Sequence, residues 1–162
     1  MHLCRAAEDR DIRHYFYGAA EGTLRKLSQR LLLLFPRIKI VGTFAPALRP
    51  IHYQEDVSVL EAINAAKPDI LWVGLGSPKQ DYWMVEHLSK LNVPVVIGVG
   101  AAFDFHAGVK KQAPLWIQRG GFEWLFRLCS EPRRLWRRYL VGNLKFIYYL
   151  LLDVASGAFF SK

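Results

Sequence analysis

The sequence predicts an α/β protein in which a Rossmann-like parallel sheet, flanked by helices, is followed by a basic amphipathic helical appendage at the C-terminus. The sheet is predicted because short apolar runs, most of them followed by glycine, alternate with longer helical patterns. The appendage is predicted by charge. Residues 108–162 carry 10 Lys and Arg against 3 Asp and Glu, whereas residues 1–107 carry 12 against 11. This asymmetry predicts an anionic partner for the last third of the chain.

The first hundred residues contain the elements of the predicted sheet. Four apolar runs are predicted to be strands: residues 14–18, 38–42, 69–73 and 94–100. Three helical patterns separate them: residues 21–34, 56–66 and 81–90. Such an order builds parallel units with right-handed crossovers, so the C-terminal ends of the strands meet at one edge of the sheet, where ligands bind. We therefore expect four glycines at that edge: Gly18, Gly42, Gly74 and Gly100.

The composition excludes several classes of protein. A chain of 162 residues that is 52% hydrophobic and 22% charged is long enough for one core and too apolar for a disordered protein. Residues 1–11 contain no apolar run typical of a secretory signal, so we expect a cytoplasmic protein. Residues 31–34, all leucine, are too few to span a bilayer and are predicted to be the buried end of a helix. Cys4 and Cys129 are too few for a disulfide framework or a zinc motif.

The turn after the third predicted strand, residues 74–81, is the most informative segment. Gly74 and Gly76 allow close approach of a ligand to the backbone. Lys79 and Gln80 place a positive charge and an amide donor at the start of the next helix, where a phosphate or a sugar hydroxyl could bind. The alternative is that a strand-to-helix turn needs glycine and proline for its own geometry, and the local pattern leaves both interpretations open.

The pattern changes after Gly100, where residues 101–114 are predicted to be a loop and the chain beyond Leu115 is predicted to be helical. After Pro132, basic and apolar residues occupy opposite faces of one helix. The basic face is Arg133, Arg134, Arg137 and Arg138, and the apolar face is Leu135, Trp136, Tyr139 and Leu140. The uncharged run that follows, residues 146–152, is too short to cross a bilayer.

Three interpretations of this basic helix are open from the residues. Residues 132–152 could lie on an anionic membrane surface, because aromatic and cationic side chains suit the headgroup region. Alternatively, the apolar face packs on the protein core and the arginines are solvated. A basic module that binds nucleic acid is the third, but no helix-turn-helix, RNP or zinc pattern accompanies the helix, so we expect no nucleic-acid partner.

Three sequence blocks, in order, resemble the WecG/TagA/CpsF family, glycosyltransferase family 26. They are residues 71–81, residues 98–108 and a third block made of residues 121–128, 131–134 and 137–139. Residues 41–44 and 49–50 also fit the family pattern. The resemblance implies an enzyme, peripheral on the inner face of the cell membrane, that takes a sugar of the N-acetylmannosamine or uronic acid type from a UDP-sugar. The acceptor would be a polyprenyl-diphosphate-linked saccharide, in the synthesis of cell-wall polymers such as teichoic acid or of exopolysaccharide. It also implies that no metal or other cofactor is required.

The resemblance assigns roles to individual residues. Gln80 matches a family glutamine expected to hydrogen-bond the donor or the acceptor, and three arginines match those expected to stabilise the diphosphate: Arg127, Arg134 and Arg137. The nucleotide-binding candidates are Gly74, Gly76, Lys79 and Asp104. For Asp104 a loop cap is the structural alternative, and Glu123 could be the partner of a neighbouring arginine. Residues 1–118 would then form the nucleotide-sugar-binding domain, and residues 119–162 the appendage that faces membrane and substrate.

The sequence also departs from the family pattern. Family members normally carry a further α/β segment before the strand that corresponds to residues 14–18, with an aspartate proposed as the general base. We expect this chain to be either a truncated, catalytically inactive homologue or one that a partner chain completes. The exposed sheet edge would then favour a homo-oligomer. In addition, Gln112 occupies a position where the family usually has arginine.

Overall fold

The computed structural model describes the backbone of residues 1–46 and 53–155, although not every side chain in the helices that begin at Tyr53 and Pro132. The described chain divides into two compact units, Met1–Lys111 and Gln112–Lys162. We call them the sheet unit and the helical unit. They are defined by contacts and not by function, so the functional division predicted at residue 118 stays a prediction.

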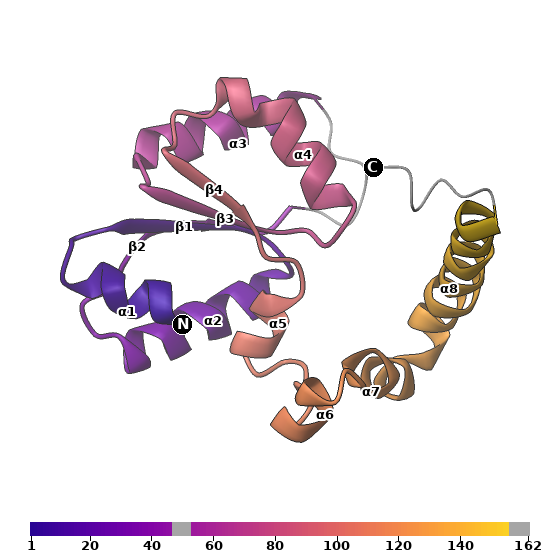
Figure 1. The fold of residues 1–162 in the computed structure, drawn as a ribbon. Coiled ribbons are helices and arrows are strands. Elements are labelled where there is room, and N and C mark those ends of the chain that lie inside the picture. The colour runs from indigo at the N-terminus through magenta and orange to yellow at the C-terminus, as the bar shows by residue number, and fades with distance from the viewer. Residues whose placement is uncertain (47–52, 156–162) are drawn as a thin grey trace. The chain divides into compact units, whose positions relative to one another are not determined.

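The sheet unit contains four parallel strands in the order β2-β1-β3-β4. The strands are β1 (Arg13–Gly18), β2 (Lys39–Phe44), β3 (Ile70–Gly74) and β4 (Val95–Gly98). Strands and helices alternate along the chain (Figure 1). Helix α1 (His2–Glu8) precedes β1, and α5 (Ala102–His106) follows β4; the helices between strands are α2 (Glu21–Leu34), α3 (Tyr53–Ala66) and α4 (Lys79–His87) with the 3-10 turn η1 (Leu88–Lys90). The predicted Rossmann-like α/β fold is confirmed.

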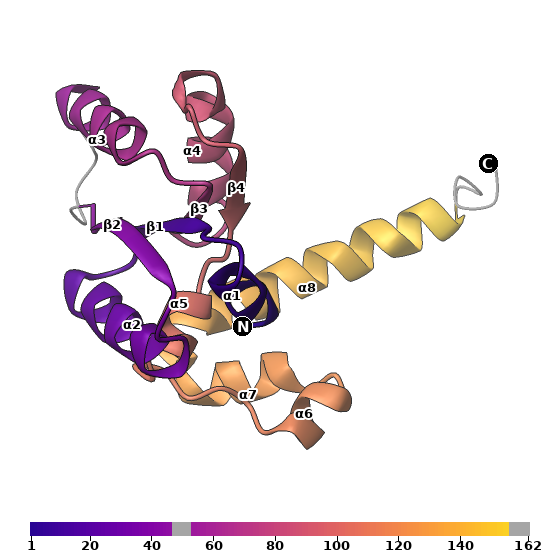
Figure 2. The same ribbon diagram turned by 90° about the vertical axis from the view of Figure 1, so that its left-hand side faces the viewer.

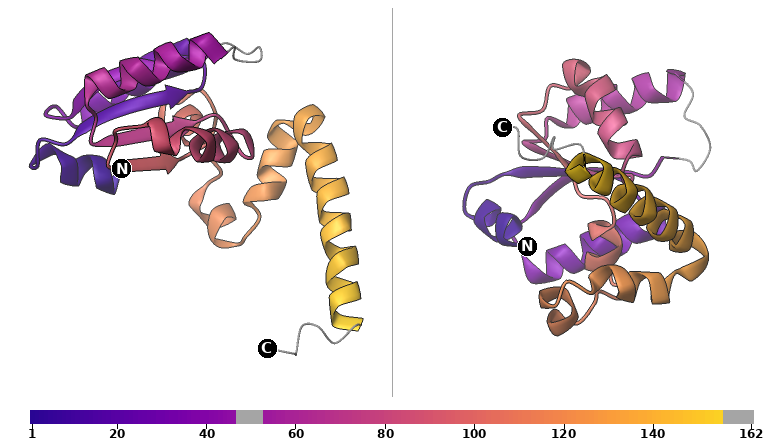
Figure 3. Two further views of the ribbon diagram at one scale, coloured as in Figure 1. Left: turned by 90° about the horizontal axis from the view of Figure 1, so that it is seen from above. Right: turned by 45° about the vertical axis from the view of Figure 1, so that its right-hand side comes forward.

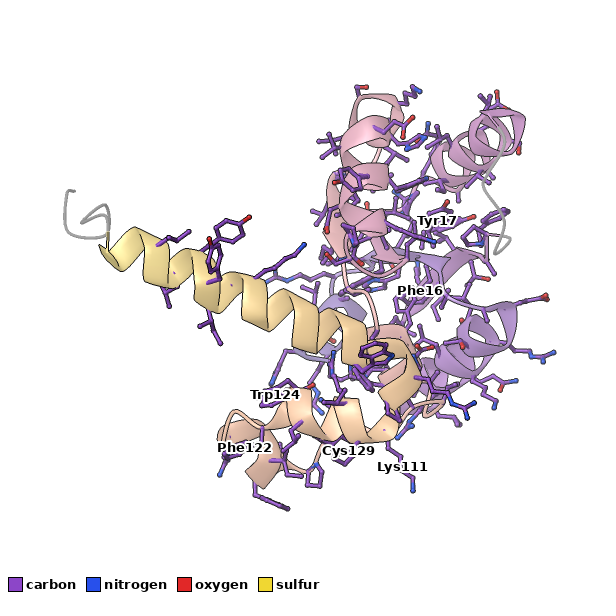
Figure 4. The ribbon with its side chains drawn as sticks, turned by 90° about the vertical axis from the view of Figure 1, so that its right-hand side faces the viewer. Phe16, Tyr17, Lys111, Phe122, Trp124 and Cys129 are labelled. Atoms are coloured by element: carbon purple, nitrogen blue, oxygen red, sulfur yellow. The ribbon has the colours of Figure 1, made fainter. Side chains whose placement is uncertain are left out.

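Each face of the sheet is covered by its own set of helices (Figure 2). On one face, Phe16 of β1 packs with Leu24, Leu27 and Leu31 of α2 and with Phe103 of α5. On the other face, the buried residues come from β1, β3, α3 and α4: Tyr15, Tyr17, Val59, Leu60, Ile63, Leu71, Val73 and Trp83. Because side chains alternate along a strand, the neighbours Phe16 and Tyr17 belong to opposite faces (Figure 4). The central strands are thereby buried on both sides, as parallel sheets require.

The element pattern predicted from the sequence agrees with the structure apart from two short helices, the C-terminal ends of β2 and β4, and the first residues of α3 and α4. Helix α2 has the predicted bounds. Helix α1 was not predicted, and α5 lies inside residues 101–114, where a loop was predicted. The prediction for residues 31–34 was wrong for three of the four, because Leu31 is buried whereas Leu33 is 82% exposed. Helices α1 and α5 are too short to show a clear hydrophobic period. They are held by the tertiary contacts of Cys4 in α1 and Phe103 in α5.

The prediction that Gly42 lies at the carboxyl edge was also wrong. Strand β2 continues to Phe44, and Gly42 pairs with Tyr15 in the middle of the ladder. A Cβ atom at position 42 would collide with the ring of Tyr15. The glycine is therefore required by packing inside the sheet and not by a ligand.

The helical unit contains α6 (Leu115–Arg119), α7 (Glu123–Ser130) and α8 (Pro132–Ala155). The prediction that the chain is helical beyond Leu115 is confirmed as far as the structure describes it. Helix α8 runs for 24 residues without interruption (Figure 3). In the described ranges, no helix combines the length and the apolar character needed to cross a membrane.

Candidate functional site

The carboxyl edge of the sheet is built by the turns that follow β1, β3 and β4. Gly18 and Gly74 are paired in register, and Ala19 N–H donates to the Gly74 carbonyl oxygen at 3.0 Å. A Cβ atom at Gly18 would lie 2.6 Å from the Gly74 carbonyl carbon, so the two backbones touch directly. Beyond β4, Val99 N–H donates to the Val73 carbonyl oxygen at 2.8 Å. Main-chain contacts thus join the turns after β1, β3 and β4 side by side. This agrees with the prediction that Gly18, Gly74 and Gly100 lie at one edge of the sheet.

The turn after β3 leads from Gly74 into α4, and Gln80 N–H closes it by donating to the Gly76 carbonyl oxygen at 3.0 Å. Gly76 has a φ of +79°, a backbone conformation that residues with a side chain rarely adopt. A Cβ atom there would meet nothing within 4 Å, so packing does not require glycine at this position. The turn geometry therefore explains Gly76 by itself, as the structural alternative stated. Lys79 is exposed at the first position of α4, and Ser77 Oγ donates to Asp81 Oδ2 at 2.8 Å.

Gln80 joins this turn to the one after β4. Its Oε1 accepts a hydrogen bond from Gly100 N–H at 2.9 Å, across 20 residues of sequence. The side chain is partly buried, so this contact is better shielded from water than a surface hydrogen bond. The structure therefore brings the Gln80 side chain to the same edge as Gly74 and Gly76.

Asp104 lies in α5 and has partners inside the sheet unit. Its Oδ2 is 3.1 Å from Lys110 Nζ, and its Oδ1 accepts a long hydrogen bond of 3.5 Å from Thr23 Oγ1. Its carbonyl oxygen accepts from the N–H groups of Val109 and Lys110 at 2.9 and 3.1 Å. These contacts fasten the turn after α5 to α2, which supports the structural alternative for Asp104. A role in nucleotide binding stays a prediction.

A small apolar pocket of about 90 Å³ lies between the sheet and the helices α1, α2 and α5, which cover one of its faces. Phe16, Trp72, Val99 and Phe103 contribute to its lining, together with His106. Burial lowers the pKa of His106, with the charges of the N-terminus and Arg30 as smaller causes in the same direction. A neutral imidazole among apolar groups does not suit a diphosphate, so this pocket is not the anion site.

The predicted arginines all lie in the helical unit. In α7, Arg127 Nη2 and Nε donate to Glu123 Oε1 at 2.7 and 3.1 Å, one helical turn apart. Glu123 is therefore the partner of a neighbouring arginine, as its structural interpretation stated. Arg134 and Arg137 belong to α8, but their side chains lie outside the described residues. The catalytic roles of all three arginines stay predictions.

Sequence reasoning missed two features of the edge. One is Gly98, which was placed in a predicted strand and in a block that resembles the family but was given no role. A Cβ atom there would lie 2.9 Å from Gln80 Nε2, so Gly98 lies directly against the Gln80 side chain. The other is Thr23, buried beneath Asp104. The glycine at the end of β4 and the one two residues later were a visible signal, but the residue they contact, Gln80, lies 20 residues before Gly100. Among the described residues, no three His, Cys, Asp or Glu side chains form a group that could hold a metal ion.

Comparison with known proteins places the chain in a family. The model of the glycosyl transferase WecG/TagA/CpsF family matches residues 1–158. An N-acetylglucosaminyldiphosphoundecaprenol N-acetyl-beta-D-mannosaminyltransferase of Bacillus spizizenii is 32% identical over 138 residues, which are 85% of this chain and 51% of the relative. A protein of the same name from Staphylococcus aureus strain MW2 is 35% identical over 103 residues, which are 64% of this chain and 38% of the relative.

The matched regions thus span about half of the Bacillus relative and 38% of the Staphylococcus one. The family match extends through the sheet unit and most of the helical unit. Both units, with the carboxyl-edge turns described above, therefore lie inside the matched region, and the chain belongs to the WecG/TagA/CpsF glycosyl transferase family.

Proposed function

We propose that this chain forms the UDP-sugar-binding part of a glycosyltransferase that moves N-acetylmannosamine to a polyprenyl-diphosphate-linked N-acetylglucosamine in cell-wall synthesis. The observation that carries the proposal is the family match over residues 1–158. The names of the curated relatives supply the sugar and the acceptor. An N-acetylmannosamine donor agrees with the first of the two sugar types that the sequence resemblance implied.

The UDP group would bind at the carboxyl edge of the sheet. At Gly76 the backbone is uncovered, because a Cβ atom there would meet nothing within 4 Å, whereas the Cβ position of Gly74 is filled by the ring of Phe103, so Gly74 would contribute its main chain alone. Lys79 offers a positive charge at the start of α4. Gln80 contributes an amide at the junction of two turns. This is the position at which open parallel sheets bind nucleotides, since the strand ends and helix starts converge there.

The charge that develops on the diphosphate as the glycosidic bond breaks would be stabilised by arginine. Arg127, Arg134 and Arg137 are the proposed groups, because a guanidinium can bind two phosphate oxygens at once and stays charged at all working pH values. On this proposal transfer needs no metal cofactor, and a chelator such as EDTA leaves the rate unchanged.

Residues 132–152 would rest on the anionic inner surface of the cell membrane, where the polyprenyl acceptor resides. The support comes from α8, in which four neighbouring apolar or aromatic side chains are exposed: Phe146, Ile147, Tyr148 and Tyr149. Tyrosine is favoured at the headgroup level, and because four consecutive helical residues point to all sides of the helix, any side of this stretch would offer an apolar or aromatic side chain to the interface.

The test is a transfer assay with UDP-N-acetylmannosamine and a lipid-diphosphate-linked N-acetylglucosamine acceptor, alongside a UDP-binding titration. We expect saturable UDP binding, and release of UDP that depends on the acceptor. Arg134→Ala with Arg137→Ala should weaken both substrate affinity and vesicle binding. Arg25→Ala, an exposed arginine on α2, is the matched control and should change neither. Absence of UDP binding by the unsubstituted chain would contradict the proposal.

A further inference from the structure

The orientation of the Gln80 amide is fixed by its partner. Gly100 N–H can only donate, so the atom that faces it at 2.9 Å must be the side-chain oxygen and not the nitrogen. The two N–H bonds of Nε2 then point elsewhere. Nε2 has no hydrogen-bond partner among the described residues, and it is not one of the buried unpaired polar atoms. The amide nitrogen of Gln80 is thus open to water or to a ligand.

The segment after β4 is shaped to hold this side chain. A Cβ atom at Gly98 would lie 2.9 Å from Gln80 Nε2 and 2.9 Å from Met84 Cε, so the amide lies directly against the bare Gly98 backbone. Gly98 does not have a positive φ, so its own conformation does not require glycine. Position 98 has no side chain because two side chains of α4, Gln80 and Met84, occupy the space that it would take. Of these two, only Gln80 is polar.

We infer that Gln80 brackets the turns after β3 and β4 through its side-chain oxygen and contacts the ligand through its side-chain nitrogen, so that it presents only hydrogen-bond donors to the ligand. This rests on the proposed function, because the ligand in question is the UDP-sugar. The oxygen of the amide is committed to Gly100, so the ligand atom that meets Gln80 is a hydrogen-bond acceptor, such as a phosphate, carbonyl or hydroxyl oxygen. The sequence left open whether Gln80 serves the donor or the acceptor substrate, and this geometry specifies that the ligand atom it meets is a hydrogen-bond acceptor.

The first test separates the two ends of the amide. Gln80→Glu keeps an oxygen for Gly100 N–H but removes both donors, so the melting temperature should stay near that of the unsubstituted chain while UDP-sugar affinity falls by about tenfold or more. Gln80→Met removes both ends and should lower the melting temperature as well. Gln29→Glu, the same change at an exposed position of α2, controls for the added negative charge and should leave the affinity unchanged.

The second test is a double-mutant cycle between Gly98→Ala and Gln80→Ala, read in the melting temperature without ligand. The added methyl group should be damaging when Gln80 is present and better tolerated when it is absent, so the two changes should couple. Additive effects would overturn the bracket. If UDP binds and Gln80→Glu binds it as tightly as the unsubstituted chain, the donor assignment is overturned while the proposed function stands. If the unsubstituted chain binds no UDP, the proposed function fails, and the ligand-free cycle still decides the bracket.

Discussion

The sheet unit and the helical unit treat apolar side chains differently. In the sheet unit, Tyr17, Ile63, Leu71 and Val73 are fully buried between strands and helices. In the helical unit, the described apolar side chains are mostly exposed: Leu115, Trp116, Phe122, Trp124, Leu125, Trp136, Phe146, Ile147, Tyr148, Tyr149, Leu150 and Leu152. Trp124 on α7 and Phe122 just before it are two of these side chains (Figure 4). An amphipathic pattern therefore predicts that a helix forms, but it does not predict what covers its apolar face.

The largest effect should come from one substitution made in both units. Leu71→Ala removes a fully buried side chain from β3 and should lower the free energy of unfolding by about 3 kcal/mol. Leu152→Ala on α8 removes a half-exposed side chain and should cost less than about 0.5 kcal/mol. Urea denaturation followed by circular dichroism measures both. Equal losses of unfolding free energy in the two variants would show that the helical unit has a core of its own. The two units would then not differ in how they bury apolar side chains.

The exposed tyrosines of α8 should matter for membrane binding and not for stability. Replacing Tyr148 and Tyr149 together by serine should weaken partition into vesicles that contain anionic lipid by roughly tenfold, because two aromatic rings are lost from the interface. Vesicle flotation measures the change. Tyr82→Ser, on α4 of the sheet unit, is the matched control because Tyr82 is also exposed. The membrane proposal would be wrong if the control and the double variant behaved alike.

The sheet unit should lose stability in mild acid through His14. This side chain is fully buried, and its Nδ1 accepts a hydrogen bond from Trp72 Nε1 at 3.1 Å. Burial lowers the pKa of His14, with the Asp69 charge opposing in part. Since the unfolded chain takes up a proton near the ordinary value of 6.5 and the folded chain does so only at lower pH, the contribution of His14 is complete above pH 6.5 and is lost as the pH falls.

The urea midpoint measured from pH 7 to pH 5 tests this sign. His14→Gln should start from a lower stability, because it disturbs the buried site, but should show a flatter decline with falling pH. A variant with the same slope as the unsubstituted chain would assign the acid loss to other groups.

The smallest effect concerns the ion pair on α7. Glu123→Gln removes the charge partner of Arg127 one turn away and should destabilise the helical unit by about 0.3 kcal/mol, since both side chains are partly exposed. Raising the salt concentration should erase the difference between the variant and the unsubstituted chain. A loss of 1 kcal/mol or more that persists in high salt would mean that the pair belongs to a buried network.

The parts of the fold predicted from the sequence are those that local pattern determines. The periodicity of α2 is long and ends at Phe35 and Pro36, so its bounds could be predicted, whereas five-residue α5 has too few turns to show a period. Gly42 was assigned to a strand end because glycine often follows a strand, but packing against Tyr15 decided its place. The prediction that residues 31–34 are buried was wrong for a similar reason. The periodicity of α2 does not show how far along the helix its turns are covered by the sheet.

The candidate site was predictable only in its local half. The turn at Gly74–Gly76 and the start of α4 follow from adjacent residues, and the structure has them at the edge of the sheet. The contact between Gln80 and Gly100 depends on β3 and β4 being neighbours, which a single sequence does not specify. The partners of Asp104 are likewise non-local, since Thr23 precedes it by 81 residues.

The most direct test of the account is an NMR titration of the chain with UDP, because glycine amides are readily resolved. We expect saturable shifts concentrated at the amides of Gly74, Gly76 and Gln80, and at Gly98 and Gly100 across the edge. Shifts confined to residues of α3 or β2, or no shifts at all, would contradict the claim that the carboxyl edge of this sheet binds the nucleotide.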